Sequence, residues 1–586
     1  MIVWVTAAAV ALTRLFAISK TLWDWDEALF ASALLDFNVK LHHPHPPGFP
    51  LFVAAAHVAR LFTSSDFRAL QVVNVIAAML LVPLTFALAR SLRMSFAESY
   101  VAASILAFLP NVWFYGGTAF SDVSALAVVI GAAAALFFSR WEEGRLYLAG
   151  CLLLGAAIAF RPQNALIGMY PWLSASWVRI RERRALEVTV GAFAVLAVAL
   201  LSYTGAALAS GSLGDYIAAV RMHEAYVRTV DSYRNPGRPP LLEALVMFIN
   251  PYEALKLASC VWSLAVIGLL RMRRAAIETL LTFGPFFAFA WIMLDVFGAS
   301  RLSIGFMPLL ALLAAQGIST IASVMSAGRA SFAAALQFVM GAAVVGGLIV
   351  WTVPALRVVR TTDSPPVAAA RWIAMHVPPA GITLYVHTSL EPFPPYLLPN
   401  YRRIFVDDDF SGAEVANPRS AWLVAEGHAA FENGVSFSRP SRRLWQIVRH
   451  RYFDVFVRPL ASWVVFDRGW YGQEGAHDDV WRWMSRRSVT RLSPGNGELR
   501  VRFHVPIDAA PKPPVVTISM NGQVLDKFTA TSDEVDKTYA VAGNGAQQNQ
   551  LVIETDQPVV PAQAVKGADT RELGLQLLAL SWRPVS

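Results

Sequence analysis

The stretch that decides the fold is WDWDEALFASALLDFNVKLHHPHPPGFP, from Trp23 to Pro50. It follows the first apolar segment of the chain directly, and it gathers carboxylates, histidines and prolines in fewer than thirty residues. Ionisable side chains are costly inside a bilayer, so this stretch should lie at the membrane surface. A mere tether would need none of these groups, and the cluster therefore indicates a functional site.

The composition of the whole chain is that of a membrane protein. Of its 586 residues, 55% are hydrophobic and only 15% are charged, whereas soluble domains are about 45–50% apolar. The two cysteines lie in apolar runs and exclude a disulfide framework. We expect a polytopic α-helical membrane domain over residues 1–355, with a first loop at 20–69. A small soluble α/β domain should follow at 356–461, and a jelly-roll-like β-sandwich at 462–586.

Apolar runs indicate about eleven membrane-spanning helices, several of them short, against the roughly 20 residues that a bilayer needs. The expected spans are 2–19, 70–88, 97–115, 122–139, 145–160, 163–178, 186–209, 255–270, 276–297, 302–324 and 332–353. The run from Phe49 to Phe62 is shorter and carries His57 and Arg60. We interpret this run as a helix that lies along the membrane interface.

Charge sets the orientation. If 49–62 does not cross, the arginines at 90–93, 140–145, 179–184, 271–274 and 329 share one side, as the positive-inside rule requires. The first loop, the loop at about 210–254 and the C-terminal domains then lie outside the cytoplasm. We expect a multi-pass protein of a bacterial-type inner membrane, and its basic charge does not indicate nucleic-acid binding.

The C-terminal part alternates short strands with turns, and Asn521-Gly522 between two strand-like runs predicts a hairpin. Aromatic residues precede the sandwich at Trp470, Tyr471, Trp481 and Trp483. These rings either stack on sugars or pack in the sandwich core.

Three carboxylates open the first loop: Asp24, Asp26 and Glu27. Just outside a membrane, such groups act as a general base or hold a divalent cation. The alternative is structural, because Asp26 could cap the following helix. Asp122 starts a later apolar helix on the same side, where both alternatives apply again.

Other polar candidates lie on the same predicted face. His42, His43 and His45 lack metal-ligand spacing, but His45 could lie near a carboxylate. The remaining candidates are cationic or aromatic residues expected to contact a phosphate-bearing substrate: Arg161, Arg221, His223 and Arg301. Arginine suits phosphate because its planar fork donates two hydrogen bonds, although solvent or lipid headgroups are alternative partners.

An ordered set of motifs resembles the GT-C glycosyltransferases that use polyprenyl-phosphate sugars, such as protein O-mannosyltransferases and lipid A aminoarabinose transferases. The matching pieces are Asp26-Glu27, the run from His45 to Gly48, Asp122 after PNVWFYGGTAF, and the late span RLSIGFMPLLALLAAQGI. The resemblance covers residues 1–355. Gly48 departs from the leucine that mannosyltransferases prefer, and Asp24 is an additional acid.

The resemblance implies inverting transfer of a sugar from a polyprenyl-phosphate donor to a lipid, glycan or protein acceptor, on the outer face of the membrane. Asp26 matches the proposed base or metal ligand, Glu27 follows it in the catalytic pair, and Asp122 matches the second acid. Asp26 and Asp122 would share one divalent cation, Mg²⁺ or Mn²⁺, if a metal takes part. The alternatives are a transporter and a non-catalytic membrane-anchored glycan-binding protein.

Overall fold

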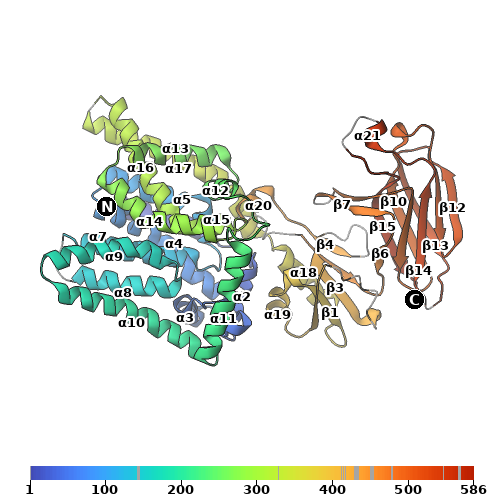
Figure 1. Cartoon of the computed structure of the whole chain (residues 1–586), viewed down its shortest axis with the longest axis horizontal. Helices are drawn as coiled ribbons and strands as arrows, with labels where there is room; N and C mark the ends of the chain where they lie inside the picture. The colour runs from blue at the N-terminus through green and yellow to red at the C-terminus, as the bar shows by residue number, and fades with distance from the viewer. Residues whose placement is uncertain are drawn as a thin grey trace. The chain divides into compact units, whose positions relative to one another are not determined.

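A computed structural model describes residues 2–585, except 142–144, 328, 409, 411, 413–414, 416, 428–433, 449–453, 477–478, 546 and 565–568. Its contacts divide the chain into two compact units, which Figure 1 shows as a helical part and a strand-rich part. The first unit comprises Met1–Asp363 and Pro440–Tyr452, and the second comprises Ser364–Arg439 and Phe453–Ser586.

The first unit is helical throughout its described residues. Its α-helices are α1 (Ile2–Leu15), α2 (Trp25–Ala33), α3 (Pro50–Ala59), α4 (Asp66–Ser91), α5 (Phe96–Phe108), α6 (Pro110–Tyr115), α7 (Asp122–Phe138), α8 (Arg145–Phe160), α9 (Asn164–Arg181), α10 (Ala185–Ala209), α11 (Leu213–Tyr226), α12 (Leu241–Ile249), α13 (Leu255–Leu270), α14 (Arg274–Met293), α15 (Ala299–Leu302), α16 (Met307–Met325), α17 (Ala330–Thr361) and α20 (Arg442–Val448). Short helical turns of other types are η1 (Val39–Leu41), η2 (Arg60–Phe62), η3 (Val227–Asp231) and η4 (Ile304–Phe306).

Each of the eleven predicted spans falls on one of these helices or on two in succession. Among the described residues, five helical segments are long and apolar enough to cross a membrane: Asp66–Ser91, Ala185–Ala209, Arg274–Met293, Ala299–Met325 and Ala330–His376. Six further apolar helices are shorter, and the segment Pro50–Phe62 is one of them. In that segment Leu61 and Phe62 are exposed. The helical class of the unit is as predicted, whereas length and composition alone support five crossings.

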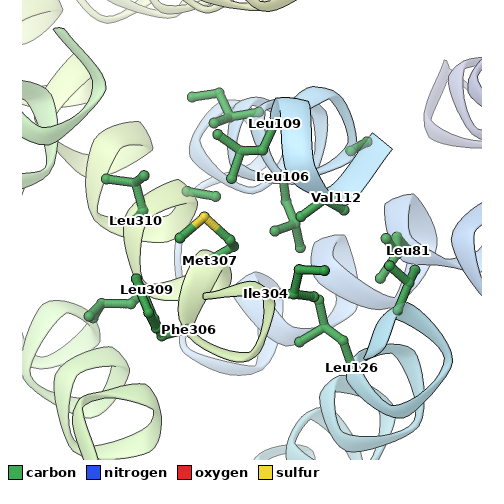
Figure 2. Packing of buried hydrophobic residues seen from close by; sticks show 14 of the residues in the cluster. Leu81, Leu106, Leu109, Val112, Leu126, Ile304, Phe306, Met307, Leu309 and Leu310 are labelled. Carbon is green, nitrogen blue, oxygen red and sulfur yellow. The ribbon is translucent and has the colours of Figure 1, made fainter. Parts of the chain in front are cut away.

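The core of the first unit is a continuous apolar cluster. Figure 2 shows Leu106 of α5, Leu126 of α7 and Met307 of α16 pointing into the same packed region. Helices α13 and α16 approach most closely at Gly268 and Gly317, where an added Cβ would overlap backbone atoms of the facing helix. Small residues allow such close approach where helices pack inside a bilayer.

Basic loops from different parts of the sequence meet at one end of the helical unit. Arg140 forms a 2.7 Å ion pair with Glu278, and Arg274 contacts the same carboxylate at 3.0 Å. The Arg93 guanidinium lies 3.6 Å from the centre of the Trp141 ring. The turns that follow α4, α7 and α13 therefore lie together, as the charge pattern predicted.

The second unit begins with a mixed sheet of order β2-β1-β3-β5-β4, in which β1 is parallel to both β2 and β3. Its elements are α18 (Pro365–His376), β1 (Thr383–His387), η5 (Thr388–Leu390), α19 (Phe393–Leu397), β2 (Arg402–Val406), η6 (Pro418–Ser420), β3 (Ala421–Glu426), β4 (Val435–Phe437) and β5 (Val455–Pro459). Helix α20, which lies within the range expected for the α/β domain, packs instead into the apolar core of the first unit through Leu444 and Ile447.

Two five-stranded sheets follow, of order β13-β10-β15-β8-β7 and β12-β11-β14-β9-β6. Their elements are β6 (Val464–Phe466), β7 (Trp470–Ala476), β8 (Asp479–Met484), β9 (Arg487–Leu492), β10 (Gly497–His504), η8 (Ile507–Ala509), β11 (Val515–Met520), β12 (Gln523–Thr529), β13 (Glu534–Val541), β14 (Asn549–Thr555), α21 (Pro561–Ala564) and β15 (Gln576–Pro584). One apolar core joins residues of both sheets, so they pack face to face as a sandwich.

Local sequence explains several of these strands. Burial alternates along β10, where Leu499 and Val501 are buried while Arg500 is exposed. The predicted hairpin is confirmed, because Asn521 and Gly522 join β11 to β12 with positive φ angles of 51° and 83°. The Trp470 indole also packs in this region, and its Nε1 donates a 3.0 Å hydrogen bond to Thr490.

Candidate functional site

The acidic stretch forms the start of α2. The Asp24 carboxylate accepts a 3.1 Å hydrogen bond from the Asp26 amide, and Glu27 completes a capping box with it. Such a box satisfies the amide groups that a helix leaves free at its N-terminus. The helix cap is therefore Asp24 and not Asp26, which corrects the structural alternative considered for Asp26. Asp26 is left available for other contacts.

Glu27 joins two loops that are far apart in the sequence. Its fully buried carboxyl group accepts hydrogen bonds from the backbone amides of Trp23 at 2.5 Å, Asp24 at 3.2 Å and Ala119 at 2.8 Å. Burial raises the pKa of Glu27 to about 8, while these three N–H groups act against the shift. Because Ala119 immediately precedes the segment that carries Asp122, Glu27 fixes one acidic loop against the other.

Asp26 is paired with Arg301, which lies in α15 at the start of the late span. The Arg301 Nη1 donates to Asp26 Oδ2 at 2.5 Å, and both side chains are only about a tenth exposed at 10% and 11%. The guanidinium also lies 4.6 Å from the centre of the Phe120 ring. The ring faces the cation, an attractive arrangement that helps to hold Arg301 in place.

His45 lies on the other side of the same carboxylate. Its Nδ1 is 3.6 Å from Asp26 Oδ1, and its ring packs against Phe30 and Phe49 at centroid distances of 5.7 and 4.8 Å. Burial lowers the pKa of His45 to about 3, and the positive charges of Arg301 and Arg161 act in the same direction. His45 is therefore neutral at physiological pH.

The turn after His45 has a conformation that requires glycine. Gly48 has φ of +99°, and a Cβ at this position would lie 2.8 Å from Val39 Cγ2. Both facts exclude a leucine here, which explains the departure from the mannosyltransferase pattern. The turn places Phe49 against His45 and, with a ring-centre distance of 5.5 Å, against Arg161.

The second acidic residue is also paired with an arginine. Asp122 lies in the first turn of α7, and its Oδ1 accepts a hydrogen bond from Arg161 Nη1. The preceding residue, Ser121, occupies the N-cap position and makes no side-chain capping bond. Asp122 thus forms an ion pair with Arg161, and its carboxylate is no N-cap.

A small cavity of about 40 Å³ adjoins the second pair. Its polar wall includes Asp122, Arg161 and Gln163, and the Gln163 Oε1 has no hydrogen-bond partner among the described residues. Its remaining lining is largely apolar: Ala125, Leu126, Phe286, Leu294 and Leu302, with Asn164 and Gly305 beside them. At about 40 Å³ the cavity has room for a few water molecules and is smaller than a sugar-binding site.

The predicted residues fall into three groups in the structure. Asp26, His45, Asp122, Arg161 and Arg301 are linked by direct or shared contacts and make up the candidate site. Its aromatic members, Phe49 and Phe120, were not proposed as site residues from the sequence, although Phe49 directly follows the run from His45 to Gly48 and Phe120 ends the motif PNVWFYGGTAF.

Asp24 and Glu27 form the second group, since their contacts tie the site together. The third group belongs to α11. His223 lies with its ring 5.8 Å from that of His45, and burial lowers the pKa of His223. Arg221 is exposed, and the described residues provide no ion pair for it. His223 therefore borders the site, whereas Arg221 faces outward.

The arrangement does not fit a cation held by Asp26 and Asp122. Each carboxylate already accepts a hydrogen bond from an arginine. Within the described parts of the chain, no three His, Cys, Asp or Glu side chains lie close enough together to hold a metal ion. Divalent cations prefer several carboxylate or carbonyl oxygens, and a guanidinium offers none.

Comparisons with known proteins give structural likeness only. No protein-family model and no curated protein sequence matches the chain. Similar solved structures include ArnT from Cupriavidus metallidurans bound to undecaprenyl phosphate, with 13% identity, a TM-score of 0.49, and coverage of 78% of this chain and 97% of that one.

Two longer structures are also similar. Arabinofuranosyltransferase AftD from Mycobacteria has 10% identity and a TM-score of 0.41, with coverage of 99% of this chain and 60% of that one. Arabinosyltransferase EmbB from Mycobacterium smegmatis has 9% identity and a TM-score of 0.41, with coverage of 100% and 64%. These structures are of the kind that the sequence resemblance predicted.

Proposed function

We propose that this protein is an inverting glycosyltransferase, which moves a sugar from a polyprenyl-phosphate donor to an acceptor hydroxyl. The observation that carries the proposal is the pair of carboxylate–guanidinium contacts, Asp26–Arg301 and Asp122–Arg161, at one end of an apolar helical bundle. A lipid-linked donor must present its phosphate at such a place, because its tail stays in the hydrocarbon region.

The two arginines would bind the donor phosphate. Arginine forms strong charge-assisted hydrogen bonds with phosphate oxygens, and each guanidinium group also lies over an aromatic ring, Phe49 for Arg161 and Phe120 for Arg301. When the phosphate replaces Asp26 as the hydrogen-bond partner of Arg301, the Asp26 carboxylate is released. Donor binding thus produces the base that the reaction needs.

The acceptor then attacks. Asp26 takes the proton of the acceptor hydroxyl, and the oxygen attacks the anomeric carbon from the face opposite the phosphate. The bond between that carbon and the phosphate oxygen breaks, so the electron pair leaves with the polyprenyl phosphate. Arg301 and Arg161 stabilise the added negative charge, and the anomeric configuration inverts. Asp122 orients the acceptor, while neutral His45 accepts or donates a hydrogen bond beside Asp26.

The reaction would take place outside the cytoplasm. The arginine-rich turns after α4, α7 and α13 meet at one end of the bundle, and cytoplasmic loops carry such an excess of basic residues. Helices α4 and α7 begin at the site, so the site lies at the opposite end. If the eleven spans expected from the sequence all cross the membrane and the segment Pro50–Phe62 does not, the C-terminal domains lie on the outer side as well.

The direct test is incubation of the purified protein with a panel of polyprenyl-phosphate sugars and a general hydroxyl acceptor. Released polyprenyl phosphate and the new glycoside are both measured. We expect transfer by the unchanged protein and a loss of at least a hundredfold in Asp26→Asn, whereas Glu224→Gln, an exposed carboxylate of α11, should behave as the unchanged protein. Full activity in Asp26→Asn, or sugar flux into proteoliposomes without transfer, would refute the proposal.

A further inference from the structure

A second cleft, of about 460 Å³, lies within the second unit. Its lining comes from the helix and strands of the mixed sheet on one side and from β10 and β15 of the sandwich on the other. Ligand clefts for small molecules commonly measure about 300–1,000 Å³. The cleft is therefore large enough to hold part of an oligosaccharide.

One wall of the cleft is aromatic. Trp372 of α18 and Trp422 of β3 line it with ring centroids 5.8 Å apart and planes tilted by 56°. Both indoles are partly exposed. His376 stacks on Trp372 at 4.6 Å and bonds the Trp372 carbonyl through Nδ1, which fixes that ring. Two partly exposed indoles offer flat apolar faces to a ligand.

The facing wall is formed by small side chains and arginines of β10 and β15. Side chains alternate along β15, so that Trp582 is buried in the sandwich core while Ser581 and Arg583 line the cleft. Arg500 lies opposite Ser581 in the register of β10 and β15 and pairs with Asp536 at 2.6 Å. The described residues provide no ion pair or hydrogen bond for the Arg583 guanidinium. Arg583 is exposed at the cleft and can pair with an anionic group on a ligand.

We propose that this cleft binds an anionic glycan, one that carries carboxylate or phosphate groups, as part of the acceptor. That the bound glycan is an acceptor rests on the proposed glycosyl transfer. A sugar ring stacks on Trp372 and Trp422, and its anionic substituent pairs with Arg583. Ser581 leaves room for the ring between the two walls and offers it a hydroxyl.

The test measures binding with the full-length protein in detergent. Tetragalacturonate serves as the anionic probe and maltotetraose as the neutral probe, each titrated by calorimetry. We expect saturable binding of tetragalacturonate, at least tenfold weaker in Trp422→Ala and in Arg583→Ala. Arg487→Ala should leave binding unchanged, because Arg487 is an exposed arginine of β9 that pairs with Glu554 elsewhere on the sandwich. Thermal unfolding of each variant shows whether it is folded.

Several outcomes would overturn the inference. These are the absence of saturable tetragalacturonate binding, equal binding of the two tetrasaccharides, and unchanged binding in folded Trp422→Ala and Arg583→Ala. Hydrolysis of a polyprenyl-phosphate sugar by water, measured in parallel, needs no glycan acceptor and should be the same in these variants. If the cleft binds glycan while donor turnover is absent, the proposed transfer fails and the binding site stands. If the donor is turned over but the cleft binds no glycan, only the assignment of the cleft fails.

Discussion

Replacement of Arg301 by alanine should separate the structural role of the Asp26–Arg301 pair from its chemical role. The variant leaves the Asp26 carboxylate almost buried and without the guanidinium that pairs with it at 2.5 Å. Breaking a buried ion pair by removing one partner costs about 3–5 kcal/mol, because an uncompensated charge remains. We therefore expect a marked drop in the thermal unfolding midpoint of Arg301→Ala.

A second substitution should repair the stability but not the chemistry. In the double variant Asp26→Asn with Arg301→Ala, the buried negative charge is gone, so much of the lost free energy of unfolding should return. Transfer should not return, because both the base and a phosphate ligand are missing. Loss of one group that stabilises charge in a transition state lowers kcat by about 100- to 1,000-fold. We therefore expect the kcat of Arg301→Ala alone to fall by at least about a hundredfold.

Two assays decide between these expectations. Thermal unfolding in detergent reports stability, and released polyprenyl phosphate reports transfer, with the exposed Arg234→Ala as the matched control. The ion-pair reasoning is wrong if the double variant is no more stable than Arg301→Ala. The assignment of Arg301 to the donor phosphate is wrong if folded Arg301→Ala keeps transfer within tenfold of the unchanged protein.

Four further predictions follow from the structure. Glu27→Gln replaces an acceptor oxygen by a donor amide, so one of three backbone N–H groups loses its partner; unfolding should be easier by about 1–3 kcal/mol and kcat should fall more than the donor KM rises. Because the folded protein keeps His45 neutral to about pH 3, its free energy of unfolding should fall as the pH drops below about 6.5, by at most about 1.4 kcal/mol per pH unit, and pH-dependent unfolding of His45→Gln should lack this contribution. Gly317→Val should destabilise the helical unit by about 1–3 kcal/mol or abolish its expression, whereas Gly346→Ala, where an added Cβ meets nothing within 4 Å, should be tolerated. Transfer should survive EDTA treatment, since arginines occupy both carboxylates expected to bind a cation; loss of transfer that Mg²⁺ or Mn²⁺ restores would contradict this expectation.

Much of the fold follows from the sequence, because apolar length and strand alternation are local signals. All eleven apolar runs became helices, and Asn521-Gly522 formed its hairpin. The position of α20 could not be predicted, since it depends on tertiary packing of Leu444 and Ile447 against the helical core. No local pattern distinguishes that helix from one that covers a sheet.

The site was only partly predictable, because its contacts also depend on tertiary packing. Residue type and membrane topology predicted that Asp26, Asp122 and the arginines lie on one face of the membrane domain. The partner of each carboxylate, however, depends on distances in three dimensions. Ion pairing of Asp26 with a residue 275 positions away leaves no trace in the local sequence. The role of Glu27 was likewise hidden, because backbone amides carry no residue-specific signal.

The pairing of both carboxylates with arginines bears on how a lipid-linked sugar is protected from hydrolysis. Water is far more abundant at a membrane surface than any acceptor hydroxyl, and an idle base would activate it against the donor. Under the proposed function, Asp26 and Asp122 stay paired with arginines until a donor phosphate displaces them, so Asp26 becomes a base only where a donor is bound. The extent of hydrolysis then depends on how long the bound donor waits before an acceptor docks.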